Sequence, residues 1–131
     1  MSCERDYYKK SGESQYHNRQ IKRREKWESV LLHAFDGARN RSLKLGREFN
    51  IDYDFVHDLY EKQDGKCFYS NLFMETSGSN VMSIDRVDSS GGYTKDNVVL
   101  CCHAANIMKN SRNAEAFINF CGSVWNNRKQ T

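Results

Sequence analysis

The 131-residue sequence contains no proline, no low-complexity tract and no internal repeat. Its apolar runs all fall well short of the roughly 20 residues that a membrane-spanning helix needs, and its first residues lack the apolar core of a secretory signal. Nothing marks a flexible linker between separate domains. These absences predict a single intracellular domain that neither spans nor binds a membrane.

Disulfide bonds are not expected, because the five cysteines are an odd number that includes an adjacent pair. An intracellular chain also keeps its thiols reduced. Cys101 and Cys121 fall on the apolar faces of predicted elements, so we expect both to be buried thiols.

The formal net charge is only +3, but the charge is divided unevenly along the chain. Residues 1–48 carry a local charge of +5, whereas residues 49–131 carry −2. This division suits an arm that grips a polyanion, joined to a site that holds a cation; a solvated basic helix face is the alternative that charge alone leaves open. We therefore expect a basic helical arm at residues 1–50, packed on a core at residues 51–131. The basic residues expected to contact a polyanion are Arg19, Lys22, Arg23, Arg24, Lys26, Arg39, Arg41, Lys44 and Arg47.

Hydrophobic periodicity predicts an α+β fold that is mostly helical. Residues 1–13 are polar and are expected to fray. Helices are expected at 14–35, at 38–45, from a cap at Asp52 or Asp54 to about 64, at 103–109, and from a cap at Ser111 or Asn113 onward. Strands are expected at 67–69, 81–86 and 97–101. The apolar stripe of the last helix, which includes Phe117 and Trp125, is expected to pack on the body.

The most informative stretch is residues 84–110, IDRVDSSGGYTKDNVVLCCHAANIMKN. It places a carboxylate, Asp85, at a strand end, then a glycine-rich loop, then Asn97 at the start of the next strand and Asn106 on the following helix. A strand–loop–strand–helix unit folds back on itself, so Asp85 and Asn106 can meet across it. Two hard oxygen donors would hold Mg²⁺ or a similar ion and leave positions open for water and a phosphate oxygen.

This stretch resembles the HNH nucleases, which have the ββα-metal (His-Me finger) fold, and in particular their viral, phage and mobile-element branch with an Asp-Arg pair in the signature. The resemblance extends to residues 59–72, LYEKQDGKCFYSNL. It implies an endonuclease that hydrolyses phosphodiester bonds of double-stranded DNA with Mg²⁺, Mn²⁺ or another divalent cation, in a homing, restriction or similar setting. It also implies a location in the cytoplasm of a bacterial host or of a virus-infected cell, and it leaves the nucleus as an alternative location. One centre cuts one strand, so a monomer would nick and a symmetric homodimer would break both strands.

Carried over position by position, the resemblance implies a role for each polar residue of the motif. Asp85 would be the metal-binding carboxylate, and Asn106 would be the second protein ligand. Asn97 would tie the loop to the motif and orient its neighbours. Lys109, one helical turn after Asn106, would lie near the phosphate backbone of DNA.

Arg86 departs from the family pattern, which usually has a histidine general base directly after the Asp. A guanidinium keeps its proton and cannot act as a base. It could instead clamp the scissile phosphate and offset the charge that builds there. The proton acceptor would then be Tyr93, because relatives with Asp-Arg commonly carry Gly-Tyr in this loop, or else His103. Asp88 is a third candidate, which could also hold Arg86 in place.

A structural zinc is not expected, although many relatives have two CxxC pairs that form a site of four thiolates. Here the first pair is Cys67 and Ser70 and the second is Cys102 and Ala105, so only half of the thiolates remain. Packing by the last helix would have to replace the metal.

Two other classes of protein remain open. A non-catalytic DNA-binding protein on a degenerate HNH frame would explain the missing histidine, whereas Asp85 and Asn106 argue against it. A protein–protein module, such as a nuclease-derived repressor or inhibitor, would lack salt-dependent affinity for DNA.

Overall fold

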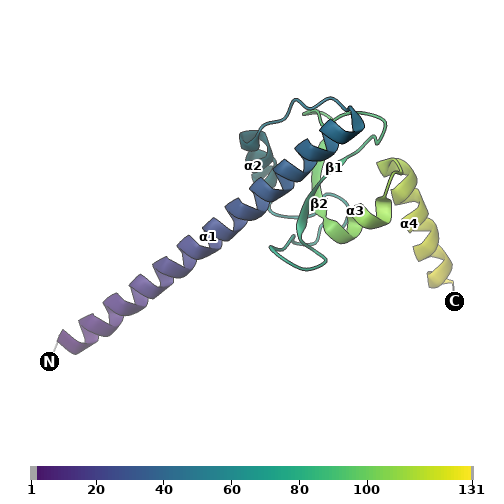
Figure 1. Cartoon of the computed structure of the whole chain (residues 1–131). Helices are drawn as coiled ribbons and strands as arrows, with labels where there is room; N and C mark the ends of the chain where they lie inside the picture. The colour runs from purple at the N-terminus through teal and green to yellow at the C-terminus, as the bar shows by residue number, and fades with distance from the viewer. Residues whose placement is uncertain (1–2, 131) are drawn as a thin grey trace.

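A long helix, α1 (Cys3–Leu45), leads into the rest of the fold (Figure 1). The computed structural model describes the backbone of residues 3–130 and the side chains of residues 14–130. The predicted fraying is wrong for residues 3–13, and so is the predicted break before Ala38, because the backbone is helical from Cys3 to Leu45. Residues 1–2 lie outside the described residues. A glycine inside a helix costs only about 1 kcal/mol, and next to Gly37 the side chain of Ala38 is buried in the core. The helix ends at Gly46, whose φ is +62°, as its predicted C-cap requires.

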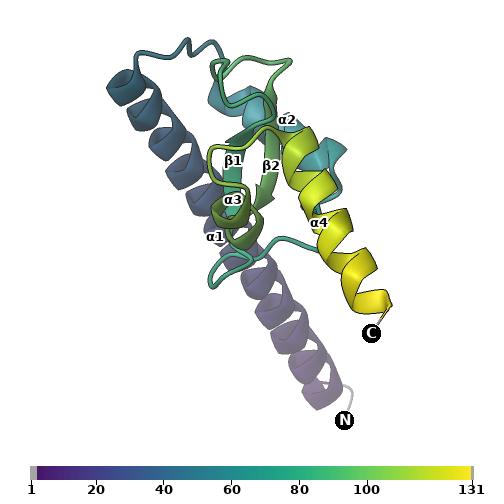
Figure 2. The same cartoon turned by 90° about the vertical axis from the view of Figure 1, so that its right-hand side faces the viewer.

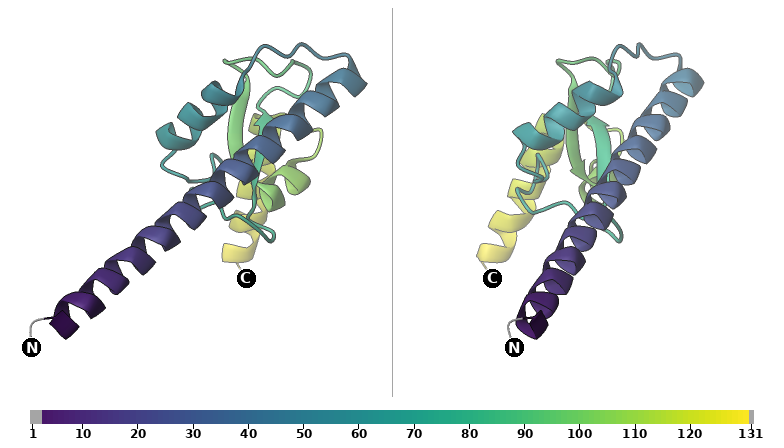
Figure 3. Two further views of the ribbon diagram at one scale, coloured as in Figure 1. Left: turned by 60° about the vertical axis from the view of Figure 1, so that its left-hand side comes forward. Right: turned by 90° about the vertical axis from the view of Figure 1, so that its left-hand side faces the viewer.

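The centre of the fold is a two-stranded antiparallel sheet of β1 (Met82–Arg86) and β2 (Val98–Cys102), in which Asp85 lies opposite Val99. Helix α3 (His103–Lys109) follows β2 directly and packs on both strands. The strands and α3 lie between α1 and the last helix, α4 (Ala114–Lys129) (Figures 2 and 3). The predicted α+β, mostly helical fold is confirmed.

The predicted strand at residues 67–69 is wrong. This segment forms a tight turn, in which the Asn71 N–H donates to the Cys67 carbonyl oxygen at 2.9 Å and the Cys67 N–H donates to the Leu72 carbonyl oxygen at 2.8 Å. Its only bridge among the described residues joins Lys66 and Phe73. Of the residues that suggested a strand, Cys67 is buried and Tyr69 packs on Phe117, whereas Phe68 is 51% exposed.

The core joins α1, α2 (Tyr53–Lys62) and the sheet. Asp52 caps α2 as predicted, since its Oδ1 accepts a hydrogen bond of 2.8 Å from the Phe55 N–H. Trp27 of α1 packs against Tyr60 of α2 with ring centroids 4.9 Å apart. The basic half of the chain is thereby fixed to the body by the second half of α1.

The prediction that the apolar stripe of α4 packs on the body holds for Phe117 but is wrong for Trp125. Phe117 is buried and meets the ring of Tyr69 edge-on at 5.6 Å, but Trp125 is 63% exposed. Past its first turns the helix diverges from the body (Figure 1). Trp125 therefore adds nothing to the core, and Cys121 is exposed rather than buried.

The remaining described cysteines are also free thiols, and Cys101 is buried as predicted. Burial raises the pKa of the Cys101 thiol well above its ordinary range, so it stays protonated. The side chain of Cys3 lies outside the described residues. Within residues 3–130, no helix has the length and apolar character that crossing a membrane requires.

Gly92 is required where the loop after β1 meets the end of the arm. A Cβ there would lie 2.6 Å from the Glu48 carbonyl oxygen, which also accepts a hydrogen bond of 2.8 Å from the Tyr93 N–H. We expect Gly92→Ala to lower the free energy of unfolding by about 1–3 kcal/mol, because backbone must shift to admit the methyl group. Chemical denaturation measures this loss. Gly122→Ala, in open space on α4, is the control and should be neutral or stabilising; equal effects of the two changes would contradict the expectation.

Candidate active site

Asp85 lies at the end of β1 and is held by two side chains from different elements. The Tyr69 hydroxyl donates a hydrogen bond to its Oδ2, and the Lys109 Nζ lies 3.3 Å from Oδ2 and 3.4 Å from Oδ1. The exposed fraction of Asp85 is 7%. The carboxylate is therefore fixed in one orientation before any ligand arrives.

Lys109 is the most deeply buried charged side chain of the described residues, with an exposed fraction of 1%. Its ammonium contacts Asp85 and also donates to the Arg86 carbonyl oxygen at 3.0 Å. The prediction that Lys109 contacts the DNA backbone is wrong for this structure, because the face of α3 that carries it turns toward β1. Its charge compensates that of the Asp85 carboxylate instead.

Asn106 lies one turn before Lys109 on α3 and faces the same cavity as Asp85. Its Nδ2 donates a hydrogen bond of 2.9 Å to the Ser83 Oγ, which fixes the side-chain amide. The cavity has a volume of about 250 Å³, and its lining includes Asp85, Arg86, Tyr93 and Asn106. The strand–loop–strand–helix unit thus brings these four sequence-predicted residues together.

Arg86 is anchored by the loop that follows it. Its Nη1 donates to the carbonyl oxygens of Ser89 at 2.9 Å and Gly91 at 2.8 Å, and its guanidinium lies 5.2 Å from the centroid of the Tyr93 ring. Asp88, the third candidate for the proton acceptor and one that could have held Arg86, accepts hydrogen bonds from Ser90. These bonds hold the pKa of Asp88 below its usual range, so it is a carboxylate at neutral pH.

Asn97 links both ends of the same loop. Its Oδ1 accepts from the Asp88 N–H at 2.9 Å, and its Nδ2 donates to the carbonyl oxygens of Asp88 at 3.0 Å and Gly92 at 2.9 Å. This geometry suits the tying role that the resemblance implied. Asn97 does not line the cavity of Asp85, so its influence on that cavity passes through the loop.

The first two of the three residues considered as proton acceptors, Tyr93 and His103, lie in different places. Tyr93 is 3% exposed and lines the cavity of Asp85, and its hydroxyl oxygen accepts a hydrogen bond of 3.2 Å from the Arg41 Nε. His103 lines a separate cavity on the other side of Ser83. The structure therefore groups Tyr93, and not His103, with Asp85 and Arg86.

Tyr69 is a site residue that the sequence analysis missed. Its hydroxyl donates to Asp85, and burial together with this hydrogen bond raises the pKa of Tyr69 far above its ordinary range. The phenol therefore stays protonated and positions the carboxylate. The turn that carries it lies 16 residues before Asp85, and only its place within residues 59–72 could have indicated the contact.

The oxygens of Asp85 and Asn106 are suitable ligands for a hard divalent cation such as Mg²⁺ or Mn²⁺, which binds few protein groups and keeps several waters. Both side chains line one cavity, and the Asn106 amide nitrogen is already engaged by Ser83. The described residues contain no cluster of three or more His, Cys, Asp or Glu side chains suited to a metal. A cation here would therefore depend on these two ligands, with water and substrate completing its shell.

The predicted DNA-binding residues of the arm are all exposed. Arg24 pairs with Glu28 at 3.3 Å, and the Arg47 Nη1 donates to the Ser90 carbonyl oxygen at 2.6 Å. Arg41 reaches the cavity of Asp85 itself. These exposed basic residues of the arm are Arg19, Lys22, Arg23, Arg24, Lys26, Arg39, Arg41, Lys44 and Arg47.

Comparisons with known proteins agree with this fold. The chain is similar to the solved structure of PacI, described as a rare-cutting HNH restriction endonuclease, with a TM-score of 0.57 and 17% identity over 76% of this chain and 81% of that one. It is also 28% identical over 128 residues to an uncharacterized protein of Acanthamoeba polyphaga mimivirus. That match covers 92% of this chain but 23% of the relative, so the chain spans about a quarter of the viral protein. No family model matches the sequence. The architecture, a mostly helical chain around a small two-stranded antiparallel sheet, resembles an HNH endonuclease fold.

Proposed function

We propose that this chain is a metal-dependent DNA endonuclease that hydrolyses phosphodiester bonds. The observation that carries the proposal is the single cavity lined by Asp85, Arg86, Tyr93 and Asn106. It combines two side chains whose oxygens can bind a cation, a fixed guanidinium and a phenol, at the junction of β1, the following loop and α3. The similarity of the fold to an HNH restriction endonuclease supports the same interpretation.

Asp85 and Asn106 would hold the divalent cation, Mg²⁺ or Mn²⁺. When bound, such a cation polarises a phosphate oxygen and stabilises the leaving 3′ oxygen. Arg86 would donate to the scissile phosphate, because its Nη1 is anchored by the loop while the guanidinium still faces the cavity. A preorganised donor of this kind offsets the negative charge that develops on the phosphate.

Tyr93 is the favoured proton acceptor, because it lies in the cavity whereas His103 does not. As a phenolate, its oxygen would take the proton of the attacking water. The Arg41 guanidinium, whose Nε is 3.2 Å from this oxygen, would stand beside the negative charge. The Arg86 guanidinium lies over the Tyr93 ring, so the anchoring of Arg86 also fixes its position relative to Tyr93.

The experiment that tests this function uses a pool of plasmids with randomised inserts, because the target sequence is unknown. The pool is incubated with the protein and Mg²⁺ or Mn²⁺, and broken ends are captured and sequenced. The proposal predicts breaks that need the cation and that leave one kind of terminus. A pool without cation-dependent breaks, under conditions where the protein binds it, would contradict the proposal. Breaks on one strand would indicate action as a monomer, and breaks on both strands a homodimer.

Replacing Arg86 separates a phosphate clamp from a lost general base. We expect Arg86→His to reduce cleavage roughly 100-fold, the usual effect of removing a preorganised donor, even though it restores the residue common in the family. Arg86→Lys keeps the charge and should retain more activity. Because Arg86 also holds the loop, thermal denaturation of both variants is the control. A gain of activity in Arg86→His would show that the native site lacks its base.

The second candidate function is DNA binding without catalysis, favoured by the guanidinium of Arg86 at the position where relatives usually carry a base. Both functions predict that the arm grips the phosphate backbone. Replacing Lys22 and Arg23 together by glutamine should weaken DNA binding and reduce the slope of log K against log salt by about 2. Fluorescence anisotropy at several salt concentrations measures the slope, with Lys62→Gln as a control. An unchanged slope would exclude both residues from the interface.

A further inference from the structure

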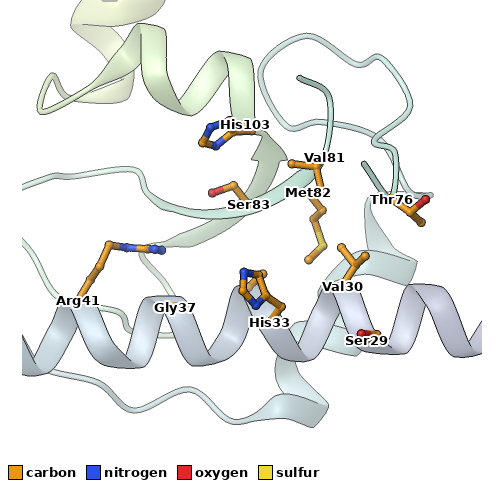
Figure 4. Close-up of a pocket in the computed structure, with 11 residues that line it drawn as sticks. Ser29, Val30, His33, Gly37, Arg41, Thr76, Val81, Met82, Ser83 and His103 are labelled. Carbon is orange, nitrogen blue, oxygen red and sulfur yellow. The ribbon is translucent and has the colours of Figure 1, made fainter. Parts of the chain in front are cut away.

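A second cavity of about 480 Å³ lies between α1, the start of β1 and the first residue of α3 (Figure 4). Its lining is rich in hydrogen-bond donors and, among the described residues, includes no carboxylate. Figure 4 shows the side chains of His33 and Arg41 rising from α1 toward Ser83 and His103 on the opposite wall. The polar residues that line it are Ser29, His33, Arg41, Thr76, Ser83 and His103.

This cavity adjoins the candidate active site. Arg41 lines both cavities, and its Nε donates to the Tyr93 hydroxyl on the side of Asp85. Between them the Ser83 Oγ accepts a hydrogen bond of 2.9 Å from the Asn106 Nδ2. A chain-like ligand whose phosphate lies beside Arg86 would therefore meet this second cavity at its neighbouring unit.

One face of helix α1 lines the cavity and carries two side-chain hydrogen-bond donors, His33 and Arg41. His33, Gly37 and Arg41 are spaced by four residues, so they lie on one face of the helix and span about 12 Å along its axis. A Cβ at Gly37 would lie 3.2 Å from the Arg41 Nη1, so the glycine leaves room for the guanidinium. This stretch of the helix is long enough for a nucleotide and not only for a single small anion.

We propose that this cavity binds the sugar and phosphate of the nucleotide next to the scissile phosphate on the cleaved strand. The assignment rests on the proposed function of the Asp85 cavity. Arg41 supplies charge-assisted hydrogen bonds to the phosphate, and the two imidazoles and the Ser83 hydroxyl supply further donors. Val30 and Met82, which also line the cavity, give the sugar an apolar surface. A lining without carboxylates suits an anionic ligand and gives a cation no charged partner.

The test uses a thymidine trinucleotide as a probe, so that no recognition sequence is needed. Binding is followed by NMR with the whole chain, through the backbone amide resonances in every sample and also through the imidazole resonances of His33 and His103 in the wild type. The double variant H33A/H103A should bind the trinucleotide roughly tenfold more weakly, the effect of losing two hydrogen bonds of about 0.7 kcal/mol each. His17→Ala, an exposed histidine earlier on α1, should bind as the wild type does.

Two further samples decide the nature of the ligand. A trinucleotide with neutral methylphosphonate linkages should bind the wild type more weakly than the normal trinucleotide, because Arg41 then meets no phosphate charge. Gly37→Ala, whose added methyl group would meet Arg41, should also weaken binding. Unchanged affinity in the double variant, or unmoved imidazole resonances, would overturn the proposal. If the trinucleotide binds as expected but no DNA is ever cut, the proposed nuclease function fails and this binding site stands. If H33A/H103A cuts DNA normally and binds the trinucleotide as the wild type does, the binding site fails and the nuclease function stands.

Discussion

Lys109→Met is expected to destabilise the fold by about 3–5 kcal/mol, the usual cost of removing one partner of a buried ion pair. The Lys109 ammonium is 1% exposed, and it contacts both carboxylate oxygens of Asp85 at 3.3 and 3.4 Å. Methionine fills a similar volume but leaves the carboxylate buried without a positive charge. Urea denaturation followed by circular dichroism measures the loss.

The double variant K109M/D85N separates the charge from packing. It removes both charges and keeps the shapes, and the oxygen of the introduced amide can still accept from the Tyr69 hydroxyl. We expect it to recover most of the lost stability, because replacing both partners of a buried pair is often close to neutral. Lys62→Met, at an exposed site on α2, is the control for the substitution itself. A double variant as unstable as Lys109→Met would show that the ion pair with Asp85 does not account for the loss.

Asn106→Ala is expected to reduce DNA cleavage by about 10³-fold or more while leaving DNA binding intact. In the proposed centre its side-chain oxygen would be one of two protein ligands of the cation, whose charge stabilisation would be worth several kcal/mol. The Asn106 side-chain amide donates to the Ser83 hydroxyl at the edge of the cavity, so the fold should tolerate its loss. Single-turnover cleavage and gel-shift assays measure the two quantities separately.

Asp85 needs a more careful substitution than Asn106. Asp85→Ala would remove the proposed cation ligand and would also leave the buried Lys109 ammonium unpaired, so lost activity could reflect unfolding. The double variant D85N/K109M avoids this problem and should also fail to cleave. Asn126→Ala, on the exposed face of α4, serves as the control. Normal cleavage by Asn106→Ala would remove this residue from the centre.

The central unit could be predicted from the sequence because its signals are local. Alternating apolar residues define β1, a continuous apolar run defines β2, the Gly91-Gly92 pair marks the loop, and helical spacing follows Cys102. The connectivity then places Asp85 and Asn106 on one cavity without further information. The continuity of α1 was missed because the sequence shows Gly37 but not the burial of Ala38 that offsets it.

Contacts between distant segments could not be predicted in the same way. Tyr69 reaches Asp85 from a turn, and periodicity reports nothing about the direction of a turn side chain. Lys109 looked like a surface cation, because lysines are rarely buried without a partner, and the sequence does not show that Asp85 is that partner. The exposure of Trp125 was missed because an apolar stripe indicates a buried face and says nothing about which surface covers it.

The most direct test of the nuclease account is the conversion of supercoiled plasmid by the wild-type protein in Mg²⁺, beside an EDTA control and the Asn106→Ala variant. The account predicts nicked or linear product in Mg²⁺ alone with wild-type protein, and neither product in the two controls. Product that persists in EDTA, or that Asn106→Ala forms at the wild-type rate, would contradict a cation-dependent centre at Asp85 and Asn106.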